Sequence, residues 1–229
     1  MPAYNEADII AEAVASVATE LQKIPGIDWR IIVADNGSSD GTGAIVEALG
    51  NPAVSVLSIS KKGKGNAIVE TARASSADVF GFIDADLSAD PRHIAELLAH
   101  LRDADIAIGS RLHKEAVVDR GVLRSLSSEV FNLMRKLALG LTVADTQCGL
   151  KLANVSGKKH LVLCQESGWF LDVEWLARLD HAGLRIREVP ISWTEQRFSD
   201  RESKLNVVTD GLRALGAFVR IRNRLQNEA

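Results

Sequence analysis

The chain has 229 residues, of which 46% are hydrophobic and 25% are charged, and its formal net charge is −3 at pH 7. This length allows one α/β domain with a sizeable core, or at most two small domains. The composition is ordinary for a soluble globular protein, and the weakly acidic balance gives no indication of a nucleic-acid partner. Cys148 and Cys164 have no metal-ligand spacing around them, which fits free thiols in a reducing compartment.

The apolar runs are too short to cross a membrane. None reaches the roughly 18 residues of a spanning helix. The N-terminus also lacks the basic start and apolar stretch of a signal peptide. We therefore expect a cytoplasmic protein with no transmembrane span, which leaves contact with a membrane surface open.

Strand-like runs alternate with helical patterns along the chain. The predicted helices cover 6–22, 42–49, 65–74 and 91–101, and the predicted strands cover 31–34, 54–59, 79–83, 105–108 and 184–193. This alternation favours a mostly parallel, doubly wound sheet with helices on both faces. The chain opens with a strand-to-helix loop, so we expect the first strand of the sheet to be missing. A miscalled or truncated start would explain this, and it predicts about five apolar codons upstream.

Two carboxylates follow the apolar run 79–83, namely Asp84 and Asp86. Ligands of open α/β sheets bind at the carboxyl ends of strands. One carboxylate can reach a ribose hydroxyl, and the other can hold a hard cation that bridges a diphosphate, as Mg²⁺ commonly does. The alternative is an ordinary loop before a helix, because Asp90 and Pro91 provide an N-cap and a first helical residue.

Two further glycine-rich loops follow strands. Asp35 ends the run 31–34 and can accept hydrogen bonds from a base or ribose, whereas Ser39 and Asp40 are simpler to interpret as helix caps. Between the run 54–59 and the next helix, residues 61–66 read KKGKGN. Basic residues at a helix N-terminus suit a phosphate, although a solvated basic turn is the alternative.

These loops carry a specific resemblance. The strings PAYNE, ADNGSSDGT, KGKGNA and DADLSADP resemble the nucleotide-sugar half of family 2 glycosyltransferases with the GT-A fold, over about residues 2–111. The resemblance implies a Rossmann-like domain over residues 1–205, followed by a basic amphipathic helix over 206–229. It implies that Asp86, with Asp84, holds Mg²⁺ or Mn²⁺ on the diphosphate. It also implies a nucleotide-sugar site made of Pro2, Ala3, Tyr4, Glu6, Asp35, Lys64, Gly65, Asp84 and Ala85.

The second half narrows the resemblance. GSR at 109–111, DTQCGLK at 145–151, GWFLDVE at 168–174 and WTE at 193–195 are similar in order to dolichyl-phosphate glucosyltransferases and mannose synthases. The DTQCG-x-K string is closest to the glucosyl branch. This implies a UDP-glucose donor, with GDP-mannose next, and a polyprenyl phosphate acceptor.

Two positions depart from the family pattern. Ser88 stands where mannose synthases usually carry Gln, which puts a third protein ligand for the metal in doubt. Asn36 replaces the second Asp of the common DDGS turn, and Asp35 remains.

The implied reaction is inverting and uses cations more than a base. A phosphate monoester is already anionic, so it needs cationic positioning rather than deprotonation. Arg111 follows the run 105–108, and its planar guanidinium suits a phosphate. Arg124 with Ser128 could extend this cradle, unless Arg124 is a surface residue, and Lys204 could close over the diphosphate. The predicted sugar site comprises Asp145, Gln147, Trp169, Asp172 and Glu174, with Asp145 alternatively a loop-ordering carboxylate.

Membrane contact is a separate prediction. Residues 122–137 and 205–225 mix apolar and basic side chains, as helices in a membrane interface do, although most amphipathic helices pack on their own core. A lipid-linked acceptor favours peripheral contact with the cytoplasmic membrane face.

Two other functions stay open, and the sequence speaks against a third. The chain could be a family 2 transferase that acts on a polysaccharide or soluble acceptor. It could also be a nucleotide-sugar-binding protein without catalytic activity. A nucleotidyltransferase would need a basic, Gly-rich loop at the first strand, which PAYNE does not supply.

Overall fold

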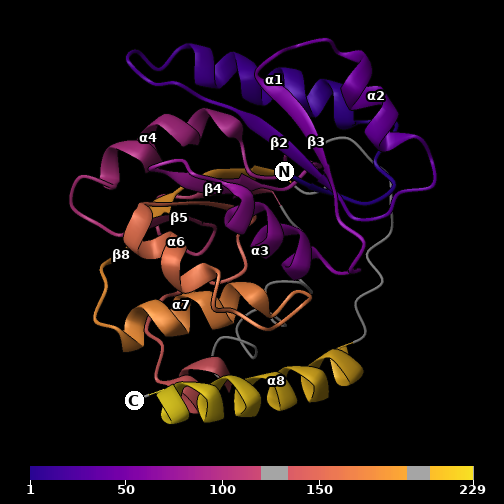
Figure 1. Ribbon diagram of the computed structural model, residues 1–229. Coiled ribbons are helices and arrows are strands. Elements are labelled where there is room, and N and C mark those ends of the chain that lie inside the picture. Colours follow the sequence, from indigo (N-terminus) through magenta and orange to yellow (C-terminus); the bar gives the residue numbers. More distant parts are fainter. Residues whose placement is uncertain (120–133, 195–206, 229) are drawn as a thin grey trace.

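The first sheet is parallel and contains the N-terminus. The structure is a computed structural model that describes residues 1–119, 134–194 and 207–228, except for the side chains of 207–212. Strand β1 (Pro2–Ala3), β2 (Ile31–Asp35) and β3 (Val54–Ser58) lie in that order. They are linked by α1 (Ile10–Gln22) and α2 (Thr42–Ala48), which lie together at one end of the molecule in Figure 1.

The second sheet has the order β4-β7-β5-β8. Its strands are β4 (Phe80–Ile83), β7 (Leu150–Ala153), β5 (Ile106–Ser110) and β8 (Ile186–Pro190). The short strand β7 runs antiparallel to both of its neighbours, whereas β5 and β8 are parallel. Helix α3 (Lys64–Ala74) precedes β4, and the helical turn η1 (Pro91–His93) with α4 (Ile94–His100) precedes β5.

A third, two-stranded sheet lies next to the loop that follows β4. Strand β6 (Val117–Asp119) lies parallel to β9 (Ser192–Thr194), and the Thr194 N–H donates to the Ser88 carbonyl at 2.9 Å. Helices α6 (Val155–Leu161), α7 (Leu171–His181) and α8 (Val207–Glu228) complete the described chain, together with a helical stretch at 134–139. None of the helices in these described ranges is apolar over a length that would cross a membrane.

Helix α8 packs on the core through one stripe. It lies beside α7, at the end of the molecule opposite α1 and α2 (Figure 1). The helix buries Ala214, Ala217, Phe218 and Ile221, which recur at the spacing of one helical face. These side chains join the cluster around Trp175 and Leu161, so α8 shares a hydrophobic core with α7 and the second sheet.

The predicted alternation of strands and helices is confirmed, with three corrections. The first strand is not missing, because Pro2–Ala3 pairs with β2; two residues are too few to give a recognisable apolar run. The antiparallel strand β7 was not predicted. The predicted strand 184–193 divides into β8 and β9, with Ile191 between them.

Candidate active site

Lys64 and Asp84 form an ion pair at the carboxyl end of β4. The Nζ of Lys64 lies 2.6 Å from Oδ1 and 2.9 Å from Oδ2 of Asp84. It also lies 5.7 Å from the ring centroid of Phe82 and 5.4 Å from that of Trp169. Burial alone would lower the pKa of Lys64, but the carboxylates of Asp84 and Asp172 outweigh burial and raise it. Lys64 is therefore a cation at neutral pH.

Gly149 leaves the space that Asp84 occupies. The Gly149 carbonyl accepts the N–H of Asp84 at 3.1 Å, so the two backbones lie side by side. A Cβ atom at position 149 would lie 2.2 Å from Oδ2 of Asp84, which is far inside van der Waals contact. The Asp84 side chain can therefore keep this position only if residue 149, the glycine of the DTQCG string, has no side chain.

Asp86 has no ion-pair partner among the described residues. Its Oδ1 accepts the backbone N–H of Ser88 at 2.9 Å. No lysine or arginine within the described ranges forms an ion pair with it. Partial burial, followed by repulsion from Asp84, raises the pKa of Asp86. A carboxylate in these surroundings is stabilised by a nearby cation.

The arrangement fits a metal ion that takes most of its ligands from a substrate. The described residues contain no group of three or more His, Cys, Asp or Glu side chains that could hold a metal ion by itself. Mg²⁺ commonly binds through one or two carboxylates together with phosphate oxygens and water. Asp86 would be the protein ligand, with Asp84 beside it, and Ser88 donates its backbone N–H to Asp86.

Asn36 joins the acidic loop to the basic loop. Its Nδ2 donates to the Lys61 carbonyl at 2.9 Å, and its Oδ1 accepts the N–H of Gly63 at 2.6 Å. Its own N–H donates to the Ala3 carbonyl at 2.9 Å. An aspartate has no hydrogen with which to bond a carbonyl unless it is protonated. The departure from the common DDGS turn therefore has a structural use, because only the amide satisfies both partners.

The remaining predicted nucleotide residues surround the ends of β1 and β2. Asp35 accepts the N–H of Ser38 at 3.0 Å through Oδ1. Tyr4 is 52% exposed, with its ring 6.0 Å from the Nζ of Lys62. The backbone N–H of Glu6 donates to Oγ1 of Thr42. Of the others, Pro2 and Ala3 form β1, Gly65 lies in the first turn of α3, and Ala85 lies two residues after β4.

Arg111 is held by Asp145 at the end of β5. Its Nε and Nη2 donate to the two carboxylate oxygens at 2.7 Å each, and its backbone N–H donates at 2.8 Å. Burial would lower the pKa of Arg111, but the bonds to Asp145 outweigh it and the pKa is raised. The Trp193 ring lies 5.6 Å from the guanidinium carbon. Asp145 thus fixes one side of the guanidinium and leaves Nη1 for another partner.

Glu188 orders the loop that carries Asp145. Its carboxylate accepts the hydroxyl of Ser110 at 2.9 Å and the backbone N–H groups of Ala144 and Asp145 at 2.8 and 3.0 Å. Gln147 donates its N–H to Asp145 at 3.3 Å. The carboxylate of Asp145 binds Arg111 and the backbone of its own loop. This fits the alternative prediction that Asp145 is a loop-ordering residue.

Asp172 is paired inside the protein. Lys151 of β7 is fully buried, and its Nζ lies 2.6 Å from Oδ1 of Asp172. The same ammonium donates to the Cys148 carbonyl and lies 5.2 Å from the Phe82 ring centroid. The charge of Asp172 also acts on the neighbouring Lys64.

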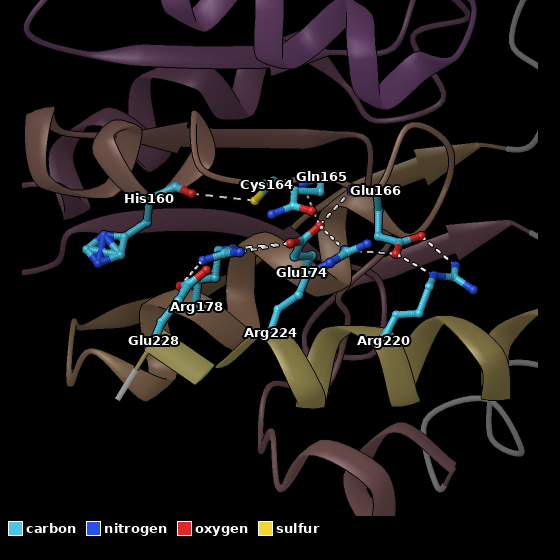
Figure 2. A network of polar contacts seen from close by, with 9 residues as sticks. All are labelled: His160, Cys164, Gln165, Glu166, Glu174, Arg178, Arg220, Arg224 and Glu228. Carbon is cyan, nitrogen blue, oxygen red and sulfur yellow. Dashed lines mark hydrogen bonds and ion pairs between the residues drawn. The ribbon is translucent and has the colours of Figure 1, made fainter. Parts of the chain in front are cut away.

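Glu174 does not join the predicted sugar site, and this corrects the sequence analysis. Its side chain is fully buried and points toward the backbone of Gln165 and Glu166, where Arg224 reaches it from α8 (Figure 2). Its Oε2 accepts the backbone N–H groups of Gln165 and Glu166, and its Oε1 pairs with Arg178. In the D-x-E pattern the two carboxylates are two residues apart on a helix, so they face different directions.

Trp169 is 70% exposed beside Lys64, where a sugar or acceptor could contact its ring. Arg124, Ser128 and Lys204 lie outside the described residues, so their predicted roles stay predictions. Sequence reasoning missed Lys151 and Glu188 as site-ordering residues. For Lys151 the available signal was a charged residue inside an otherwise apolar run, whereas Glu188 is one of three charged residues in its run and gave no such signal.

Comparison with known proteins defines the family. The family model for glycosyl transferase family 2 matches residues 1–161. The chain belongs to this family. It is 31% identical over 217 residues to glycosyltransferase AglD of Haloferax volcanii, covering 92% of this chain and 34% of that protein. It is 30% identical over 211 residues to dolichyl-phosphate beta-glucosyltransferase ALG5C of Trichomonas vaginalis, covering 85% of this chain and 63% of the relative.

A bacterial relative is similar over most of its length. The undecaprenyl-phosphate mannosyltransferase of Micrococcus luteus is 29% identical over 221 residues, which cover 93% of this family 2 chain and 89% of the relative. This chain spans less than two thirds of the length of the first two relatives.

The solved glucosyl-3-phosphoglycerate synthase of Mycobacterium tuberculosis has the same fold. The structure in complex with Mn²⁺, UDP-glucose and glycerol 3-phosphate superimposes with a TM-score of 0.69 at 22% identity, covering 95% of this chain and 76% of that one. The predicted GT-A fold is thereby confirmed.

Proposed function

We propose that this family 2 protein transfers a hexose from a nucleotide diphosphate sugar to a polyprenyl phosphate, with inversion and with a divalent metal. One observation carries the proposal. Asp84 and Asp86 follow β4, with Lys64 of α3 paired to Asp84, and the Asp145-anchored Arg111 follows β5. Asp84 is also close enough for its charge to act on Arg111. A leaving diphosphate and an attacking phosphate need such separate cationic positions.

The residues divide the chemistry between donor and acceptor. A metal ion on Asp86 would neutralise charge that develops on the departing diphosphate. Lys64 is a partly exposed cation next to that position and can contact a phosphate oxygen. An oxygen of the acceptor phosphate attacks the anomeric carbon, and the bond from that carbon to the diphosphate oxygen breaks. Because the acceptor is already anionic, no side chain has to remove a proton.

Arg111 provides the acceptor position in this proposal. Its Nη1 hydrogens are not used by Asp145, and the side chain keeps 21% exposure. A guanidinium that is fixed on one side loses little entropy when it binds phosphate on the other. Asp145 would then act by orienting Arg111, and Gln147 and Trp169 would line the sugar.

The names of the relatives support the donor and acceptor classes. A dolichyl-phosphate glucosyltransferase and an undecaprenyl-phosphate mannosyltransferase both point to a polyprenyl phosphate acceptor and to a glucosyl or mannosyl donor. The solved neighbour holds Mn²⁺ and UDP-glucose. We therefore propose UDP-glucose first and GDP-mannose second, with Mn²⁺ or Mg²⁺.

Contact with the cytoplasmic membrane face follows from a lipid acceptor and stays a proposal. Leu215 and Val219, one turn apart on α8, are 46% and 58% exposed, and Leu137 is 77% exposed. Arg220 and Arg224 of the same helix pair with Glu166. Lipid contact through α8 would therefore depend on its apolar side chains more than on these two arginines. Flotation with anionic liposomes tests it, and Leu215→Ser with Val219→Ser should reduce co-flotation.

One experiment tests the proposed activity. The protein is incubated with Mn²⁺, a short polyprenyl phosphate and a panel of nucleotide sugars, and products are identified by mass spectrometry. We expect one hexosyl-phosphate-polyprenol, and none with Asp86→Ala. A parallel reaction offers 3-phosphoglycerate and glycerol 3-phosphate. Product from these alone would contradict the lipid acceptor, and nucleotide binding without any product would favour a non-catalytic binding protein.

A further inference from the structure

Two arginines of α8 hold a single carboxylate of the segment before α7. Arg220 donates to the two oxygens of Glu166 from Nε at 3.0 Å and Nη2 at 2.8 Å, and Arg224 donates from Nη1 at 3.0 Å. Figure 2 shows both side chains reaching from α8 to Glu166. Burial would raise the pKa of Glu166, but the bonds to Arg220 and Arg224 outweigh it and lower the pKa. The carboxylate is therefore charged at neutral pH.

The backbone of the same segment is also fixed. The N–H groups of Gln165 and Glu166 both donate to Oε2 of Glu174, at 2.8 and 2.7 Å. Glu174 is fully buried, and Arg224 lies 3.3 Å from the same oxygen. Arg224 therefore contacts the carboxylates of both Glu166 and Glu174 (Figure 2). Helix α8 thus holds the segment 165–166 directly, through the Glu166 side chain, and indirectly, through the backbone N–H groups that Glu174 binds.

The next carbonyls lie against the start of α3. The Ser167 carbonyl accepts the N–H of Asn66 at 3.3 Å. A Cβ atom at Gly63 would lie 2.2 Å from this oxygen, and one at Gly65 would lie 2.4 Å from the Glu166 carbonyl. The two glycines flank Lys64, whose side chain pairs with Asp84 in the site. The close contacts of Gly63 and Gly65 with these carbonyls therefore fix the position of the Lys64 backbone between them.

We infer that Glu166 is a positioning residue: clamped by Arg220 and Arg224, it holds the segment 165–167 against α3 and so places Lys64 beside Asp84 for the leaving diphosphate. This rests on the proposed function, because it assigns to Lys64 a role in holding a nucleoside diphosphate. It also gives α8 a part in the site, although no described residue of α8 lies in it. Trp169 follows three residues after Glu166 and lies over the same lysine, so it depends on the same segment.

The test measures nucleotide affinity in the full chain. UDP and GDP are titrated with Mn²⁺ by calorimetry, and the tighter ligand of the wild type is used for every variant. Glu166→Gln keeps the shape of the side chain and removes its charge. We expect it to weaken nucleotide binding about threefold to tenfold, as groups acting through shared contacts do. Arg220→Gln combined with Arg224→Gln should give the same loss.

A double-mutant cycle separates positioning from a loss of folded protein. In a Lys64→Met background, Glu166→Gln should no longer change the dissociation constant, because the residue through which it acts is gone. A merely structural role would lower the fraction of binding-competent protein and leave the dissociation constant of the remainder unchanged. Glu228→Gln is the matched control, since it removes an ion pair between α8 and Arg178 without touching Glu166. It should lower the melting temperature and leave affinity unchanged.

The outcomes distinguish the inference from the proposed function. If wild-type protein binds neither nucleotide, the proposed function fails and the inference fails with it. If wild-type protein binds and Glu166→Gln binds equally well, the inference alone is overturned. An equal loss for Glu166→Gln with and without Lys64 would also overturn it, because the effect would then not pass through Lys64.

Discussion

Asp145 binds Arg111 through its guanidinium and its backbone at once. Both oxygens accept from the guanidinium at 2.7 Å, and Oδ2 also accepts the backbone N–H at 2.8 Å. The carboxylate side chain is only 3% exposed and the arginine side chain 21%. Such a geometry fixes both the start and the end of the arginine side chain, which is what a phosphate-binding role requires.

Asp145→Asn should weaken acceptor use more than donor binding. The amide can accept only one of the two guanidinium bonds, so Arg111 loses its fixed orientation. We expect kcat/KM for the polyprenyl phosphate to fall about 10- to 100-fold, as small misplacements of a catalytic group do. Nucleotide affinity, measured by titration, should change little. As a control, Glu70→Gln, in a surface ion pair with Arg73, should leave both values unchanged.

The stability contribution of Asp145 should depend on pH in a defined direction. Burial would raise the pKa of Asp145, but the bonds and charge of Arg111 outweigh it and hold the pKa below the usual 3.8. The folded state thus binds fewer protons than the unfolded state as pH falls toward that range. The stabilisation is fully present above pH 3.8 and is lost as pH falls through the lower folded pKa.

Urea unfolding at a series of pH values measures this contribution. The difference in unfolding free energy between wild type and Asp145→Asn should be constant from pH 7 to about pH 5 and shrink at acid pH. A difference that grows on acidification would show that Asp145 is not held as the charged form.

Gly149→Ala should displace Asp84 without unfolding the protein. The added Cβ would lie 2.2 Å from Oδ2 of Asp84, so the carboxylate and its partner Lys64 must move. We expect weaker binding of nucleotide with Mn²⁺, about tenfold or more, because a misplaced group loses most of its interaction. Titration calorimetry measures it. Gly183→Ala is the comparison: its added Cβ meets no atom within 4 Å, so the cost is limited to backbone strain at its φ of 69°.

Asp172→Asn should act on stability first. It leaves the fully buried ammonium of Lys151 with the Cys148 carbonyl but without its carboxylate. Breaking a buried pair from one side typically costs about 3–5 kcal/mol. Denaturant unfolding should show a loss of this size. Unchanged stability with altered donor sugar preference would instead support Asp172 as a sugar contact.

The fold could be predicted where a strand is apolar and a charged residue stands at its carboxyl end. The buried runs of β2, β4 and β5 stand out because both faces of the sheet are covered; Asp35 ends β2, and Asp84 and Arg111 directly follow β4 and β5. The strand β7 was hidden because it is short and carries Lys151. A lysine is rarely buried without a partner, and the pattern gave no means of seeing that Asp172, 21 residues away, provides one.

The division of the carboxylates also needed the structure. In the sequence, Asp172 and Glu174 read as one D-x-E motif, yet the first pairs with Lys151 and the second with Arg178 and the N–H groups before α7. Helical geometry turns residues two apart to different faces, so the motif alone could not assign them one role. The position of Glu166 depends on α8, whose two arginines lie 54 and 58 residues away from it in the sequence.

The central claim is that Asp86 holds a divalent cation on the nucleoside diphosphate. Electron paramagnetic resonance of Mn²⁺, titrated into the protein with UDP or GDP, measures this directly, with Asp86→Asn and Asp90→Asn compared to wild type. The account predicts that wild type and Asp90→Asn take up one Mn²⁺ together with the nucleotide, and that Asp86→Asn loses this uptake. Equal uptake by Asp86→Asn and wild type would contradict it.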